Sequence, residues 1–226
     1  MPPLTAAQRK KALASTHIIN WNTPLITHKV QELLQDMPDD PVQKAIRLFY
    51  WSRDEIVYRV TVDFNTNNYL KASSTLQRGF GHCVGKSILL TALCRAAGIP
   101  ARLHFVDLKN YLLPEHWIDR WGEELIYHGY VEIFLNDRWV IATPAYDRAL
   151  CERHNYIASE FDGIHDSFFP KTDQNGAKFI EYVKDHGAYY RVPFFKMNFA
   201  WLKHYGHYLL IQKRLEKKNN HGTTPK

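Results

Sequence analysis

Cys83 occupies a position where a thiol could act as a nucleophile. It follows the stretch Gly79-Phe80-Gly81-His82, whose glycines lack side chains and would let a substrate backbone approach closely. The residues after it have the spacing of a long helix, and a helix N-terminus stabilises negative charge. We therefore expect a favoured thiolate at Cys83, whose backbone N–H could help to hold an oxyanion. The alternative is a buried structural thiol, the commoner fate of a free cysteine.

The other two cysteines have less chemical context. Cys94 falls inside the same predicted helix, next to Leu93 and close to Ala97, so we expect it in the core. Cys151 has no neighbouring motif. Three cysteines do not indicate a disulfide framework, and they favour a reducing, cytoplasmic setting.

A nucleophilic cysteine requires a general base, and twelve histidines are available. His128 is the best candidate because it opens the clearest strand pattern in the chain, where a rigid element would hold its side chain. Taken alone, a histidine there would more often be a surface or satisfied core residue. The assignment therefore depends on its pairing with Cys83.

Helices are predicted both at the nucleophile and upstream of it. Val84, Ile88 and Ala92 recur at helical spacing, and Gly98-Ile99-Pro100 ends a helix over residues 83–97. Upstream, Thr23-Pro24 and Asp40-Pro41 each combine a capping side chain with a proline at the first helical position. We expect these two helices to reach about residue 34 and the mid-50s.

The strand pattern surrounds His128. Residues 130–135 alternate in polarity, Asn136-Asp137 has the composition of a tight turn, and residues 138–142 return, which predicts a hairpin. Residues 101–106 are a further predicted strand. For the rest of the chain, we expect loops over 61–80 and 163–176 and helices over 177–184 and 194–215.

Two blocks of sequence resemble the transglutaminase-like superfamily, which has a papain-like cysteine protease fold. The first, GHCVGKSILLTALCRAAGIPARLHF, is similar to the family's Gly-x-Cys helix with its Gly-Ile-Pro-Ala-Arg ending, here Gly98 to Arg102. The second, HGYVEIFLNDRWVIATPAYD, resembles the family's histidine strand, its turn and the tryptophan of the next strand, here Trp139. The upstream FYWSRDEIVY is similar to the family's early helix.

The resemblance implies an α+β fold in which the helix bearing Cys83 packs against a small antiparallel sheet bearing His128. We expect a single domain over residues 1–226, with a core at 40–147. Helical or irregular flanks would cover 1–39 and 148–215, and a basic tail would cover 216–226.

The third catalytic position departs from the family pattern. Many members have an aspartate four residues after the tryptophan, and this chain has Thr143. A hydroxyl can accept a hydrogen bond from imidazole, but it cannot stabilise imidazolium as a carboxylate would. We expect Thr143, which the hairpin places nearly opposite His128, to face the far ring nitrogen; Asp147, four residues further on, is the alternative.

Other polar residues receive weaker functional interpretations. Gln77, six residues before Cys83, stands where papain-like enzymes have an oxyanion-hole glutamine, but a polar loop residue is the better interpretation. Four acidic or imidazole side chains, His104, His116, Asp119 and Glu123, match no metal-ligand spacing, so we expect surface positions and neither metal nor cofactor. Arg102 is interpreted as structural, with its stem on apolar surface and its head paired with a carboxylate.

The resemblance implies acyl transfer at an amide bond of a peptide or protein, by hydrolysis, deamidation or cross-linking through a thioester. The alternative is a non-catalytic module that retains the fold for protein binding, which the missing aspartate favours. The net charge of +6 lies partly in a basic C-terminus, interpreted as a solvated end. Without a zinc-finger pattern or a phosphate loop we do not expect nucleic-acid binding, and no stretch is apolar enough to span a membrane.

Overall fold

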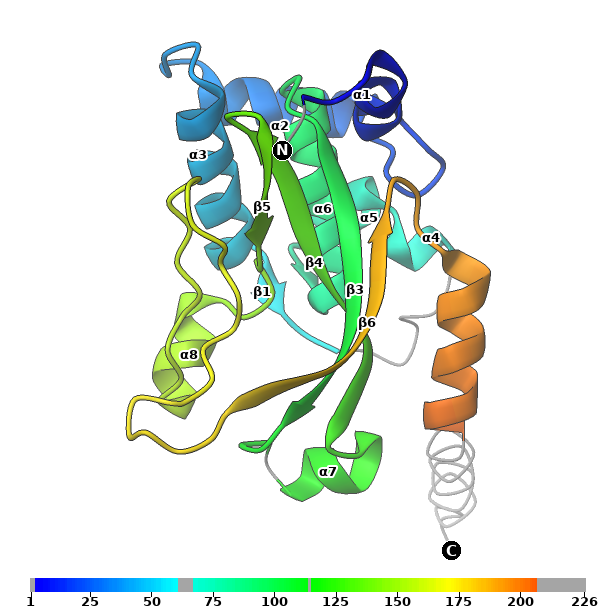
Figure 1. The fold of residues 1–226 in the computed structure, drawn as a ribbon, viewed down its shortest axis with the longest axis vertical. Helices are drawn as coiled ribbons and strands as arrows, with labels where there is room; N and C mark the ends of the chain where they lie inside the picture. Colours follow the sequence, from blue (N-terminus) through cyan, green and yellow to red (C-terminus); the bar gives the residue numbers. More distant parts are fainter. Residues whose placement is uncertain (1–2, 61–66, 114, 207–226) are drawn as a thin grey trace, which may run out of the picture.

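Helix α6 (Cys83–Ala96) is the element around which the rest of the fold is arranged. The computed structural model describes residues 3–60, 67–113 and 115–206, except for the side chains of residues 116, 120 and 121. On one side α6 packs against a four-stranded sheet, and on the other it is covered by the N-terminal helices (Figure 1). The expected α+β architecture, with the cysteine helix packed on an antiparallel sheet, is confirmed.

The boundaries of α6 follow from local chemistry. The ring Nδ1 of His82 accepts a hydrogen bond from the Val84 N–H at 3.3 Å and so caps the helix start. Gly98 has φ of +76° just beyond the helix end, a conformation that glycine adopts without steric cost. Every residue from 84 to 95 is buried, because the sheet and the surrounding helices cover all sides of α6.

The main sheet has the strand order β5-β4-β3-β6, and all its neighbours are antiparallel. Strands β4 (Glu124–Leu135) and β5 (Arg138–Ala142) form the predicted hairpin. Asn136 and Asp137, with φ of 47° and 58°, make a turn that fits the twist of the strands. Strand β3 (Ala101–Asn110) is longer than predicted, and β4 begins four residues before His128.

The N-terminal helices begin where the sequence predicts them. Helix α3 (Pro41–Asp54) is capped by Asp40, whose side chain accepts hydrogen bonds from two backbone N–H groups. Helix α2 (Pro24–Leu34) starts at its proline, but the Thr23 hydroxyl bonds to the Asn20 carbonyl instead of capping the helix. A further helix, α1 (Ala6–Leu13), precedes them.

The predicted loop over 61–80 is wrong for the part that the structure describes. Helices α4 (Asn67–Leu70) and α5 (Ala72–Arg78) lie there, and residues 61–66 fall outside the described residues. The serines and threonines of α5 have modest helix propensity, so packing against α6 decides the outcome. A short parallel pair, β1 (Val57–Tyr58) and β2 (Phe80–Gly81), then leads into Cys83.

The predicted helix over 177–184 is also wrong, because residues 180–184 belong to edge strand β6 (Ile180–Tyr189), which pairs with β3, and residues 177–179 are not helical. Its isoleucine, valine and tyrosines fit a half-buried pleated surface, which periodicity in so short a run does not reveal. The loop over 163–176 is confirmed, apart from isolated bridges. Two short helices, α7 (Glu115–Trp121) and α8 (Arg148–His154), flank β4 and β5.

Residues 194–206 are helical as predicted, and the remaining predicted helix and the basic tail lie outside the described residues. One core cluster runs from Ile18 near the N-terminus to Tyr205 in this last helix. Among the described residues, no helix is long and apolar enough to cross a membrane.

Candidate active site

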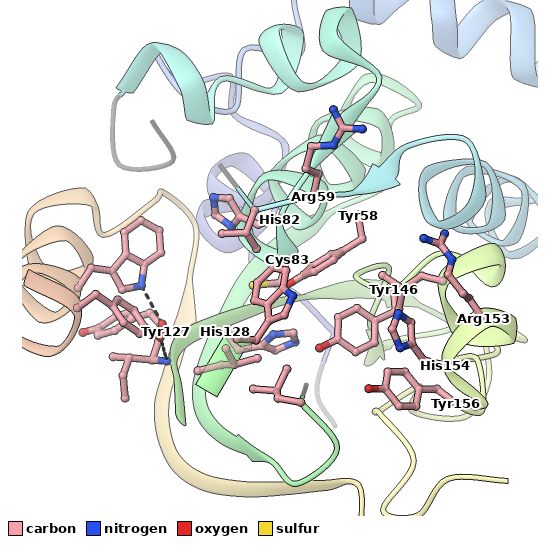
Figure 2. Close-up of a pocket in the computed structure, with 18 residues that line it drawn as sticks. Tyr58, Arg59, His82, Cys83, Tyr127, His128, Tyr146, Arg153, His154 and Tyr156 are labelled. Carbon is pink, nitrogen blue, oxygen red and sulfur yellow. Dashed lines mark hydrogen bonds between the residues drawn. The ribbon is translucent and has the colours of Figure 1, made fainter. Parts of the chain in front are cut away.

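Cys83 and His128 line the same cavity, at the N-terminal end of α6 (Figure 2). The cavity has a volume of about 330 Å³. Its walls are rich in aromatic side chains, among them Tyr58, Tyr127, Tyr146, Tyr156, Trp117, Trp201 and Tyr205. Such walls exclude water and offer flat apolar surface to a bound group.

The Cys83 sulfur combines the expected backbone donors with strong burial. Burial raises the pKa of the thiol to about 11, although N–H groups of Gly129, Val84 and Cys83 itself lower it. Two of these N–H groups belong to the helix start, and that of Gly129 belongs to β4. The expectation of a favoured thiolate is wrong, because burial outweighs the N–H groups and keeps the thiol neutral near pH 7.

His128 lies on β4 with only 1% of its surface exposed. Burial, with a smaller effect of the nearby His82, lowers the pKa of its imidazole to about 3, so the ring is neutral near pH 7. The ring packs on Phe169 with centroids 5.1 Å apart. Neither ring nitrogen makes a hydrogen bond to any residue that the structure describes.

The expected hydrogen bond between Thr143 and His128 is not formed. Thr143 is fully buried, and its hydroxyl has no hydrogen-bond partner in the described part of the chain. Ala142, the last residue of β5, pairs with Val131, so Thr143 follows the strand and lies level with Tyr130, two residues along β4 from His128. Within the described residues, the Thr143 Oγ1 and both His128 nitrogens are thus buried without a hydrogen-bond partner, which is uncommon in folded proteins.

Asp147, the alternative partner for His128, bonds instead to two backbone N–H groups. Its Oδ1 accepts the Leu150 N–H and caps α8, and its Oδ2 accepts the Tyr58 N–H of β1, both at 2.8 Å. The carboxylate therefore joins two walls of the cavity. No aspartate or glutamate occurs among the described residues that line the cavity.

The last helix supplies a wall that the sequence does not predict. The Trp201 indole N–H donates to the Ile126 carbonyl at 2.8 Å, and the Ile126 N–H donates to the Tyr205 hydroxyl at 2.8 Å. These bonds fix the segment just before His128. The only sequence signal is the density of aromatic residues after position 193.

The remaining candidates lie away from the cavity. Gln77 is exposed on α5 and does not line the cavity. Cys94 is fully buried within α6, as predicted, and Cys151 is buried on α8.

Arg102 pairs with Glu132 at 2.5 Å and stacks on Trp139, consistent with a structural role. His104 lies between the carboxylates of Glu132 and Asp185, at 2.5 and 2.6 Å, and these raise the pKa of its ring despite burial.

The other polar side chains considered for a metal do not form a site. Asp119 and Glu123 are exposed, and the His116 side chain lies outside the described part. Within the described residues, no group of three or more potential ligands could hold a metal ion.

Comparison with known proteins adds a family match. A family model of the transglutaminase-like superfamily matches residues 29–144, which is more than half of the chain. A search of curated proteins gives no match.

Two solved structures are also similar. One, a "putative cysteine protease" from Cytophaga hutchinsonii, has 15% identity and a TM-score of 0.49, with 82% of this chain and 55% of that chain covered. A "putative protease" from Parabacteroides distasonis has 10% identity and a TM-score of 0.40, with coverage of 60% and 26%. The chain spans about half the length of the first of these proteins. On the extent of the family match, the chain belongs to the transglutaminase-like superfamily.

Proposed function

We propose that this protein is a cysteine-dependent enzyme that transfers the acyl group of a peptide or protein amide, with Cys83 as nucleophile and His128 as general base. The observation that carries the proposal is the shared cavity: the thiol at the start of α6 and the imidazole on β4 line one space. Members of the superfamily are typically cysteine-dependent enzymes. The N–H groups directed at the sulfur could also stabilise a developing oxyanion.

The chemistry starts from a neutral thiol and a neutral imidazole, since burial disfavours both charged forms. Cys83 Sγ attacks the carbonyl carbon and forms a C–S bond while its proton passes to a ring nitrogen of His128. His128 then gives this proton to the leaving nitrogen, the C–N bond breaks, and an amine and a thioester result. Water or a second amine, deprotonated by His128, attacks the thioester; the C–S bond breaks and the proton returns to the thiolate.

Thr143 is the proposed third member. Its hydroxyl is buried without a hydrogen-bond partner in the described part of the chain, as are both ring nitrogens of His128. The proposal requires the two side chains to approach each other on substrate binding, and apo hydrogen bonds at catalytic sites often tighten in the complex. The Asp147 carboxylate is already occupied by two backbone N–H groups.

The second candidate function is a binding module without catalysis. The observation that favours it is the absence of a carboxylate bonded to His128 among the described residues. Such a carboxylate orients the imidazole and stabilises its protonated form in related catalytic arrangements.

Incubating the full-length chain with casein and a fluorescent primary amine separates the candidates. New N-termini report hydrolysis, ammonia reports deamidation, and incorporated fluorophore reports transfer to an amine. We expect one of these products from the wild type and from Cys151→Ser, whose thiol is buried outside the cavity, and none from Cys83→Ser. Product from Cys83→Ser would contradict the assignment of the nucleophile, and no product from any variant would favour the binding module.

A further inference from the structure

Tyr127, the residue directly before His128, has a backbone conformation that aromatic residues rarely adopt. Its φ is +56°, in the left-handed region. A residue with a bulky side chain is strained there and stays in this conformation only when its surroundings determine it. The strain is therefore located next to the proposed general base.

The cause is an irregularity in the pairing of β3 with β4. Val106 pairs with His128 and Leu108 pairs with Leu125, so two residues of β4 oppose the single Asp107 of β3. This is a β-bulge, which bends a strand and changes the direction of the side chains after it. The direction of the His128 side chain thus depends on the bulge.

Asp107 holds this bulge together. Its Oδ1 accepts the Tyr127 N–H at 2.8 Å and contacts the His186 Nε2 of β6 at 2.7 Å. The His186 ring in turn stacks on the Tyr127 ring, with centroids 4.0 Å apart and an angle of 15°. Asp107 and Tyr127 are both buried, so one carboxylate secures the backbone of Tyr127 directly and its ring through His186.

The other residue of the bulge is held by a different element. Ile126 bonds through its N–H to Tyr205 and through its carbonyl to Trp201, both in the last helix. The bulge therefore has specific partners in the sheet and in the last helix, as expected of a built feature rather than a pairing defect.

We propose that Asp107 is a positioning residue: with His186, it holds Tyr127 in the left-handed conformation, and this directs the His128 imidazole into the cavity that Cys83 lines. The proposal rests on the proposed function for its effect on catalysis. Asp107 does not itself line the cavity, so it acts through Tyr127 and His128.

The test compares Asp107→Ala, Asp107→Asn and Asp185→Ala in the full-length chain. Asp185→Ala is the matched control, because the Asp185 carboxylate bonds to His104 and to the Gly187 N–H, while the N–H groups of both bulge residues bond elsewhere. The readout is acetylation of Cys83 by p-nitrophenyl acetate, normalised to the folded fraction. We expect Asp107→Ala to slow acetylation at least tenfold. Asp107→Asn should recover most of the rate because its amide oxygen still accepts the Tyr127 N–H, and Asp185→Ala should stay within twofold of the wild type.

Glycine provides an independent check on the role of the backbone. In a Tyr127→Gly background the left-handed conformation has no steric cost, so adding Asp107→Ala should slow acetylation less than threefold. A tenfold loss in both backgrounds, or equal losses in Asp107→Ala and Asp185→Ala, would overturn the proposal.

A second readout does not depend on catalysis. The NMR signal of the His128 ring should shift or broaden in Asp107→Ala and keep its position in Asp185→Ala. An unchanged signal in Asp107→Ala would overturn the positioning role. If acetylation of the wild type does not depend on His128, the proposed function is contradicted. The positioning role of Asp107 would still be decided by the NMR comparison.

Discussion

At Cys83 and His128, burial moves two pKa values in opposite directions and thereby keeps both side chains neutral. Burial raises the pKa of the thiol to about 11 and lowers the pKa of the imidazole to about 3. A preformed thiolate–imidazolium pair would require the reverse order. In the proposed reaction the proton therefore leaves the sulfur during attack on the substrate, and His128 receives it.

This ordering predicts the pH dependence of alkylation. Because the thiol pKa is raised, the thiolate fraction of Cys83 should grow as pH rises toward about 11. The rate of iodoacetamide labelling should then increase steadily between about pH 7 and 10. Peptide mapping should find Cys83 labelled before the buried Cys94 and Cys151, whose pKa values are raised to about 12 and about 11. A rate plateau across neutral pH would indicate an ion pair, and earlier labelling of another cysteine would contradict the assignment.

Thr143 can be tested by removing its hydroxyl without changing its shape. If the hydroxyl orients His128 in the substrate complex, Thr143→Val should slow acetylation of Cys83 about fivefold to tenfold, equivalent to a hydrogen bond of about 1 kcal/mol. Unfolding temperature should change little, because Thr143 makes no hydrogen bond in the free protein within the described residues. An unchanged acetylation rate would remove Thr143 from the mechanism.

At the residue scale, the sequence identifies the pair that shares the cavity but not the residues that hold it. Cys83 is recognisable from its glycine-flanked position before a helix pattern, and His128 from its strand. Asp107 lies within an ordinary strand segment, and nothing in its sequence neighbourhood indicates a bulge. The strain at Tyr127 is likewise a property of pairing between distant segments.

At the scale of elements, a buried lysine joins α6 to the end of α3. The Lys86 ammonium donates to the carbonyls of Arg53 and Ile56, at 2.8 and 2.5 Å. Desolvation lowers the pKa of this lysine to about 7. These bonds fix the first turn of α6 relative to the end of α3 and the start of β1. They therefore also fix the position of Cys83 at the start of α6.

Replacing Lys86 with methionine should therefore destabilise the fold. Two buried carbonyls would lose their hydrogen-bond donor, and we expect the free energy of unfolding to fall by about 2–4 kcal/mol. Urea denaturation measures this change directly, and Lys10→Met on the exposed surface of α1 provides the matched control, with a change within about 0.5 kcal/mol. Equal stability of the two variants would show that Lys86 does not have this role.

The elements differ in how far the sequence predicts them. Helices α2, α3 and α6 carry clear start signals and amphipathic or apolar patterns, and their positions follow from these. Strand β6 and helix α5 do not, because each depends on a partner distant in sequence: β6 on the edge of β3 and α5 on α6. Short segments with mixed patterns are decided by the surface against which they pack.

At the scale of the whole molecule, both ends of the described chain pack on the same core. Ile18 and Ile26 from the N-terminal flank and Trp201 and Tyr205 from the last helix belong to one buried cluster with α6. Both flanks thus cover the cysteine helix, and the C-terminal flank also lines the cavity. The family resemblance covers residues 40–147, so it does not predict that the flanks contribute to the core.

Shared packing predicts a single cooperative unfolding transition. Far-ultraviolet circular dichroism, which reports the helices, and tryptophan fluorescence, which reports the cavity wall and helices, should give coincident urea curves. Two separate transitions would show that the flanks fold independently and would contradict a single domain over the whole chain.

The most direct test of the central claim is acetylation of Cys83 by p-nitrophenyl acetate in the wild type and in His128→Ala, followed by mass spectrometry of the labelled peptide. The wild type should form one acetyl thioester on Cys83, and His128→Ala should form it at least a hundredfold more slowly because no base accepts the thiol proton. Equal rates in the two proteins, or an acetyl group placed mainly on another residue, would contradict a catalytic pair of Cys83 and His128.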